Sequence, residues 1–155
     1  MNYVQQMVVG SDWSSTFLFK SGTPSIPVPI VDWTIEGKAW KSHYEWTSLF
    51  LTTEEILNDE DEIIPPRLKI QPYIVQAKDI KNDRSLVIGQ EVQILIVTLE
   101  EDDTFFLGEG TIEFEIRRVD PQPTRPILKF QMVNKKSYVR SDDPQPSQHA
   151  TKGKL

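Results

Sequence analysis

The sequence predicts a mainly β protein, an antiparallel β-sandwich with one short helix near residues 53–58 and extended termini. Its 11 Pro, 7 Gly and many β-branched and aromatic residues are typical of short strands joined by stiff loops. Between Thr111 and Arg117, apolar and polar residues alternate, which indicates a strand with one face on a core. From Val92 to Leu99 both faces are apolar, so this strand should be covered on both sides. We expect these two strands to form a hairpin through an acidic turn at 100–104.

The length and the composition of the C-terminus predict one domain followed by a tail. A chain of 155 residues can bury one sizeable core but is short for two ordinary domains. We therefore expect a single sandwich domain over residues 1–134. Residues 135–155 are polar and contain Pro, so they bury too little surface to offset their ordering entropy and should form an extended or disordered C-terminal arm.

The first part of the chain should contain two strands and a proline-rich crossing. Residues 3–9 form the first predicted strand, and the aromatic residues of 15–20 form the second. Prolines between residues 24 and 29 remove hydrogen-bond donors, so residues 24–31 cannot be a central strand. Ile26, Val28 and Ile30 are nevertheless too apolar to be left bare, and we expect them to rest on this domain or on a neighbouring subunit.

The middle of the chain should contain three strands and the helix. Residues 33–41 and 43–51 have β patterns, and Gly37 suggests a bulge. Two threonines followed by two glutamates at 52–55 have the form of a capped helix start, which predicts the helix near 53–58. Residues 67–75 form a strand that Pro72 moves toward an edge or a bulge, and residues 77–85 read as a polar loop. Residues 127–133 alternate as a last strand.

The inward positions of these strands give a predicted core shared by two sheets. Its members are Phe17, Phe19, Ile35, Ile94, Ile96, Ile112, Phe114 and Ile116.

Charge and composition exclude several classes of function. The formal net charge of −6 disfavours binding to nucleic acids or anionic membranes through a general electrostatic field, although a local basic patch stays possible. The chain contains no Cys, so it has no disulfides or thiolate metal sites. No window approaches the roughly 18 consecutive apolar residues of a membrane span. We expect neither nucleic acid nor membrane as a partner.

The residues needed for catalysis are scarce. His43 and His149 are the only histidines, so a histidine metal site or a Ser/His/Asp relay has little to be built from. Residues 59–62 are all acidic, but they lack the spacing of a calcium loop and favour a solvated loop, with calcium binding left open. Gly108 and Gly110 lie between β residues and indicate a turn or bulge rather than a dinucleotide loop. We therefore expect that the protein is not an enzyme and that it binds neither a cofactor nor a metal ion.

Tryptophans and the arm supply the candidate interaction residues. Four Trp could fill the core or line an exposed face that stacks on sugars. If Trp33 points inward, Trp40 and Trp46 are the exposed ones. In the arm, the cations that could contact other subunits are Arg140, Lys152 and Lys154.

Two stretches carry a resemblance to a known family. An aromatic strand at 15–20 is followed, after the prolines, by IVDWTIEGKA at 30–39, and an acidic turn is followed by FFLGEGTIEF at 105–114. This order resembles the small β-sandwich domain of tailed-bacteriophage baseplate and tail-fibre-attachment proteins, such as the N-terminal domain of the siphophage upper baseplate protein. The likeness spans roughly residues 12–120. The chain departs from the family in the insertion at 52–66 and in lacking the long helical segment that often follows the sandwich.

The resemblance implies a structural virion subunit of the tail, baseplate or fibre attachment, assembled in the host cytoplasm and located in the virion. Its implied partners are copies of itself, in a trimer or ring, and other virion proteins. The alternative from the residues alone is a carbohydrate- or protein-binding β-sandwich module that acts through an exposed aromatic face.

Overall fold

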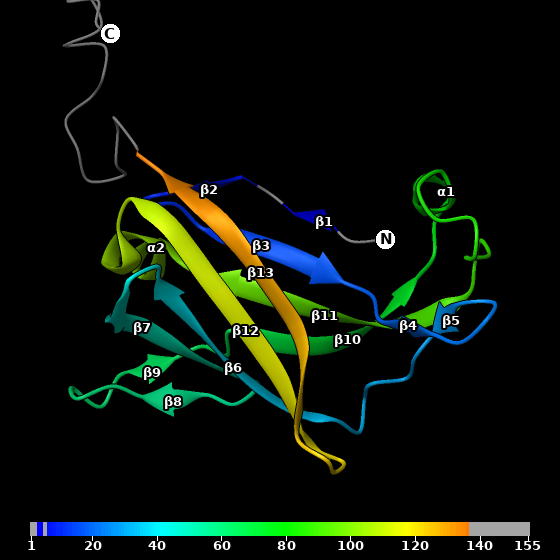
Figure 1. The fold of residues 1–155 in the computed structure, drawn as a ribbon, viewed down its shortest axis with the longest axis horizontal. Coiled ribbons are helices and arrows are strands. Elements are labelled where there is room, and N and C mark those ends of the chain that lie inside the picture. Colours follow the sequence, from blue (N-terminus) through cyan, green and yellow to red (C-terminus); the bar gives the residue numbers. More distant parts are fainter. Residues whose placement is uncertain (1–2, 5, 137–155) are drawn as a thin grey trace, which may run out of the picture.

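The computed structural model describes residues 3–4 and 6–136, and β-strands dominate it (Figure 1). The elements in chain order are β1 (Tyr3–Val4), β2 (Met7–Val8), β3 (Trp13–Phe17), β4 (Lys20–Ser21), β5 (Ile26–Pro27), β6 (Thr34–Lys41), β7 (Tyr44–Thr52), β8 (Ile56–Leu57), β9 (Ile63–Ile64), β10 (Leu68–Ile74), α1 (Ala77–Ile80), β11 (Glu91–Leu99), α2 (Glu101–Leu107), β12 (Gly110–Asp120) and β13 (Arg125–Lys135).

The strands form two main sheets and two short ribbons. One sheet has the order β1-β3-β11-β10, and the other has the order β2-β13-β12-β6-β7. Pairing is antiparallel except between β13 and β2. The ribbons are β4 with β5 and β8 with β9. The predicted mainly β sandwich is therefore confirmed.

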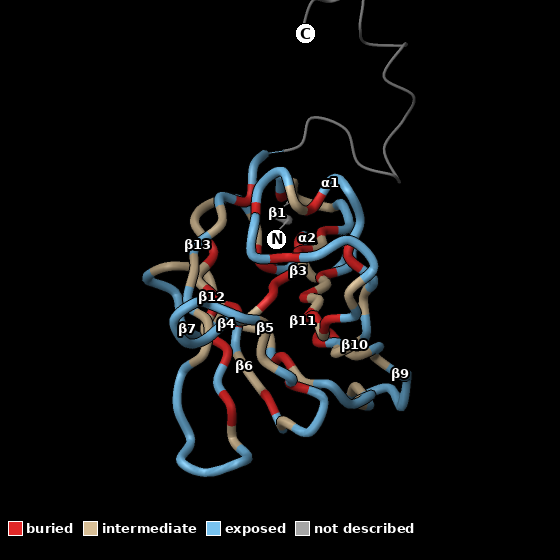
Figure 2. The backbone as a smooth tube through the Cα atoms, turned by 90° about the vertical axis from the view of Figure 1, so that its right-hand side faces the viewer, coloured by how far each residue is buried: buried red, intermediate tan, exposed pale blue. Residues whose placement is uncertain are grey.

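The core lies between the two sheets, where their buried residues meet (Figure 2). Trp13 of β3 contacts Phe114 of β12 across the sandwich, with ring centroids 5.2 Å apart. Phe114 in turn stacks on Phe130 of β13 at 4.5 Å and 6°. Of the predicted core, Phe17, Ile35, Ile112, Phe114 and Ile116 are buried in this cluster, and Phe19 packs against it partly buried.

Strand β11 is covered on both faces, as predicted, but its inward face was assigned wrongly. Leu95, Val97 and Leu99 enter the core between the sheets. Ile94 instead belongs to a second cluster on the other face of β11, and Ile96 packs against that cluster partly buried. Because both faces of the strand are apolar, alternation alone could not distinguish them.

The predicted hairpin of 92–99 with 111–117 is wrong. β11 pairs with β10 and β3, whereas β12 pairs with β13 and β6. The acidic stretch forms helix α2 instead of a turn and carries the chain from one sheet to the other (Figure 1). A reciprocal capping box between Glu100 and Asp103 begins this helix, and Thr104 and Leu107 bury its inner side.

The helix predicted near 53–58 is absent from the described residues, and residues 56–57 form β8, which pairs with β9. The Thr52 hydroxyl accepts the Glu54 N–H at 3.2 Å, so the threonine makes a local turn instead of capping a helix. The segment lacks the apolar stripe that would fix a helix on the core. A short helix, α1, lies instead within the predicted polar loop 77–85.

Gly37 serves close packing, and no bulge occurs at it. The register between β6 and β7 shifts at Trp40/Lys41. A Cβ at Gly37 would lie 2.5 Å from the Glu115 carbonyl oxygen of β12, so only glycine fits there without displacing the backbone. The prediction for Pro72 is confirmed, since β10 is an edge strand.

Candidate protein interaction surface

The outer edge of the five-stranded sheet is formed by β7, and it carries exposed aromatic side chains. In the described part of the chain, β7 is hydrogen-bonded to β6 on one side and to no strand on the other. Tyr44, Trp46 and Phe50 are 48%, 78% and 51% exposed. An unpaired edge strand with large apolar side chains can add a strand from another chain.

The turn before β7 positions the first two aromatic rings. His43 has φ 67° in the turn between β6 and β7, a loop position as expected for a surface histidine. The Lys41 ammonium lies 5.5 Å from the Tyr44 ring centroid, and the Tyr44 ring meets Trp46 edge-on at 5.4 Å and 88°. These contacts orient Tyr44 and leave Trp46 projecting into solvent.

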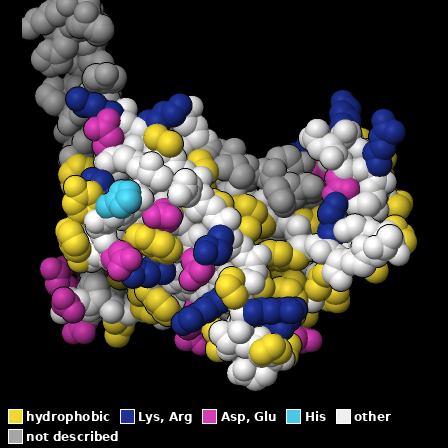
Figure 3. Space-filling view, viewed as in Figure 1, with side chains coloured by type: hydrophobic (Ala, Val, Ile, Leu, Met, Phe, Trp, Pro, Cys, Tyr) yellow, Lys and Arg dark blue, Asp and Glu magenta, His cyan; other side chains and the backbone are white. Residues whose placement is uncertain are grey.

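The chain after the β6–β7 turn is strongly acidic. Between residues 42 and 66 there is no Lys or Arg, and the carboxylates in this range, all exposed, are Glu45, Glu54, Glu55, Asp59, Glu60, Asp61 and Glu62. Leu57 and Ile63 of the β8–β9 ribbon are 64% and 62% exposed. We call Tyr44, Trp46, Phe50, Leu57, Ile63 and these seven carboxylates the acidic aromatic edge. Acidic and apolar side chains lie together along the left margin of Figure 3, the side of β7 and the β8–β9 ribbon in Figure 1.

Asn58 closes the loop between β8 and β9. Its Oδ1 accepts the backbone N–H groups of Glu60 and Glu62 at 2.8 and 3.0 Å, and its Nδ2 donates to Glu62 Oε1 at 3.1 Å. The bond from Asn58 and a further one from Glu60 lower the pKa of Glu62. Among the described residues no group of three acidic or histidine side chains is placed to hold a metal ion.

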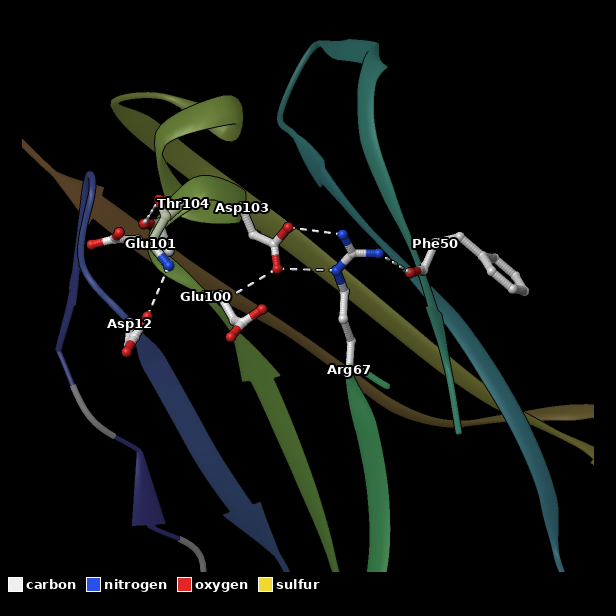
Figure 4. A network of polar contacts seen from close by, with 7 residues as sticks. All are labelled: Asp12, Phe50, Arg67, Glu100, Glu101, Asp103 and Thr104. Carbon is white, nitrogen blue, oxygen red and sulfur yellow. Dashed lines mark hydrogen bonds and ion pairs between the residues drawn. The ribbon is translucent and has the colours of Figure 1, made fainter. Parts of the chain in front are cut away.

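A buried ion pair fastens β7 to the rest of the molecule (Figure 4). Arg67, immediately before β10, donates from Nη2 and Nε to the Asp103 carboxylate of α2 at 2.8 and 3.1 Å. Its Nη1 donates to the Phe50 carbonyl at 3.0 Å. The Phe50 side chain points away from this network. We call this contact of Arg67 with Asp103 and the Phe50 carbonyl the clamp. It occupies one backbone acceptor of β7 and leaves Tyr44–Leu49 as the open part of the edge.

The proline-rich segment rests on its own domain. Gln93 Oε1 of β11 accepts the N–H groups of Ile30 and Val31. Ile30 is fully buried, so its assignment as an interaction residue is wrong, because these bonds hold it in the core. Val28 is half-buried against the core. Only Ile26, at 60% exposure, stays accessible.

The tryptophans divide between core and surface. Trp13 is buried and Trp33 packs against the core, as expected for an inward residue. Trp40 is half-buried, with the Lys38 ammonium 5.6 Å from its ring centroid, so its predicted exposure is wrong. Trp46 is exposed as predicted. Arg140, Lys152 and Lys154 lie outside the described residues.

Sequence reasoning missed Tyr44, Phe50 and the acidic ribbon as parts of one surface. The alternation of residues 44–50 puts Tyr44, Trp46 and Phe50 on one face and could have shown this grouping.

Comparison of the chain with protein-family models, curated proteins and solved structures finds no match. In the part of the chain that the structure describes, no helix has the length and hydropathy of a membrane span.

Proposed function

We propose that this chain is a structural subunit of a tailed-bacteriophage virion, a tail, baseplate or fibre-attachment component that acts by protein–protein assembly. The observation that carries the assembly role is the acidic aromatic edge, in which an open strand, Tyr44–Leu49, is combined with the 78% exposed Trp46. Exposed aromatic residues beside open backbone groups favour a protein partner. The virion assignment is supported by the resemblance at 30–39 and 105–114.

Purified particles test the proposal. A virion component copurifies with particles through a density gradient, and mass spectrometry should find it there in a fixed ratio to the major tail protein. A cytoplasmic host protein serves as the control for contamination. If the chain is abundant in the lysate but depleted from the particles as strongly as that control, it is not a virion subunit.

The exposed Trp46 also supports the alternative, a carbohydrate-binding module. A platform for sugars needs ring faces that lie side by side, whereas the Tyr44 and Trp46 planes are 88° apart. This geometry favours the protein partner. A glycan array with wild-type protein and the Trp46→Ala variant distinguishes the two, because sugar binding that depends on Trp46 would favour the alternative.

A further inference from the structure

Residues 136–140, with the sequence KSYVR, follow the last strand and form a basic segment. The segment contains Lys136 and Arg140 and no acidic residue, with Tyr138 and Val139 before the arginine. We propose that this basic segment of one copy of the chain binds the acidic aromatic edge of a second copy, as a short strand added to β7. The inference names the partner of the edge and rests on the assembly part of the proposed function.

Charge favours this pairing. Seven exposed carboxylates lie between residues 45 and 62, with Glu45 in the open part of β7 and six beyond its end, and this stretch contains no Lys or Arg, while the whole chain has a net charge of only −6. The negative charge of the protein is therefore concentrated at this edge. A cationic segment is attracted to it, and a second acidic surface is repelled. Pairing of β7 with β7 across a twofold axis would bring two acidic edges together and is disfavoured.

The open part of β7 matches the basic segment in length. Arg67 occupies the Phe50 carbonyl, so the open backbone covers residues 44–49, about 20 Å of strand. Residues 136–140 span about 17 Å when extended and cover most of it. Lys136, Tyr138 and Arg140 alternate in the sequence, so a strand formed by this segment on β7 would carry an aromatic residue between two cations on one face.

The position of β13 indicates that the segment comes from another copy. Lys135 is part of β13 and is in register with Val8 of β2. The sheet order places β13 three strands from β7, or about 14 Å, so Lys135 cannot lie along the β7 of its own chain. The contact between copies is therefore head-to-tail, and it generates a ring when the rotation closes.

Sedimentation velocity on full-length protein tests the inference. At low salt the wild type should self-associate with increasing concentration, and added salt should weaken this association. The edge variant Trp46→Ala and the arm variant Tyr138→Ala with Arg140→Glu should each associate at least about tenfold more weakly. Val87→Ala, at a 66% exposed position outside the edge and the arm, is the matched control and should associate like the wild type. Circular dichroism checks that all variants fold.

Mixing the two variants gives the sharpest result. The edge variant retains an intact basic segment and the arm variant retains an intact edge, so the mixture should form a complex of two chains and stop there. A mixture that stays monomeric, while the wild type associates, overturns the head-to-tail contact.

Other results also overturn the inference. Wild-type association that the arm variant leaves unchanged shows that another segment binds the edge, while recovery of the chain in purified particles would still support the virion role. If the wild type is monomeric at every concentration, and the arm variant changes its tryptophan fluorescence only while Trp46 is present, the segment docks within one chain. If the chain is absent from purified particles but the variants associate more weakly as expected, the virion role is wrong and the self-association still holds.

Discussion

At the scale of single residues, Asp83 shows how a buried carboxylate connects strand β4 to the loop that follows α1. Lys20 of β4 donates to Asp83 Oδ2 at 2.5 Å, and the Ser85 hydroxyl and backbone N–H donate to Asp83 Oδ1 at 2.6 and 3.1 Å. The Asp83 side chain is 7% exposed. The bond from Lys20, and then those from Ser85, hold the pKa of Asp83 well below its usual range, because they favour the charged form.

We predict that Asp83 makes stability depend on acid pH. Since its pKa is lower in the folded than in the unfolded state, its contribution is complete above the unfolded pKa of about 3.9 and is lost as the pH falls toward the folded value. Asp83→Asn should lower the free energy of unfolding by about 2 kcal/mol at pH 7 and flatten its fall below about pH 4. Urea unfolding between pH 7 and 2 measures both effects. The exposed control Glu54→Gln should keep the wild-type dependence of the free energy of unfolding on pH. If Asp83→Asn also keeps that dependence below about pH 4, the prediction is wrong.

At the scale of elements, the clamp between β10, α2 and β7 should be the costliest polar contact to break. The side chains of Arg67 and Asp103 are 10% and 13% exposed, so removing one charge leaves the other buried. Asp103→Asn and Arg67→Met should each cost about 3 to 5 kcal/mol, because each leaves the charge of the other residue buried without its partner. Denaturant midpoints measure both changes.

The surface pair Arg117 and Glu36 is the matched control for the clamp. Its side chains are 53% and 34% exposed, so Arg117→Met should change stability by less than about 1 kcal/mol. The double variant Arg67→Met with Asp103→Asn should be more stable than Asp103→Asn alone, since no buried charge then lacks its partner. If Asp103→Asn and Arg117→Met lower the free energy of unfolding by the same small amount, the clamp does not stabilise the fold.

Elements were predictable from the sequence where a local pattern determines them. The alternation around Phe114 gave the strand and its buried face correctly. Pairing was not predictable in the same way, because Val92 to Leu99 is apolar on both faces and fits either sheet. Helix α2 was missed because its acidic first residues are also typical of a loop, and because the burial of Thr104 and Leu107, which stabilises the helix, exists only in the folded protein.

The candidate surface was predictable only where a residue type or a local pattern indicates exposure. Trp46 could be singled out by its residue type, whereas the burial of Ile30 depends on Gln93, which lies 63 positions away in the chain. The open part of β7 depends on Arg67, whose bond to the Phe50 carbonyl is a tertiary contact. Long-range contacts of this kind leave no local pattern in the sequence.

At the scale of the whole molecule, the shared core couples the two sheets. Phe114 is 1% exposed and contacts Trp13 of the opposite sheet and Phe130 of its own. No single sheet can keep its inner face buried once the other has unfolded, so we expect residues 6–136 to unfold as one cooperative unit. Under native conditions the slowest amides of β3 and β11 should then exchange with the same free energy as those of β12 and β6.

Replacing Phe114 tests this coupling. Phe114→Ala should lower the exchange free energy of the slowest amides in both sheets by the same amount, about 3 to 5 kcal/mol, because the cavity lies between them. Val133→Ala, at a 57% exposed position on β13, should leave both sets unchanged. Hydrogen exchange followed by nuclear magnetic resonance resolves the two sets strand by strand. If Phe114→Ala accelerates exchange only in β12 and β6, the sheets open separately, and the core between them does not hold the molecule together as a single domain.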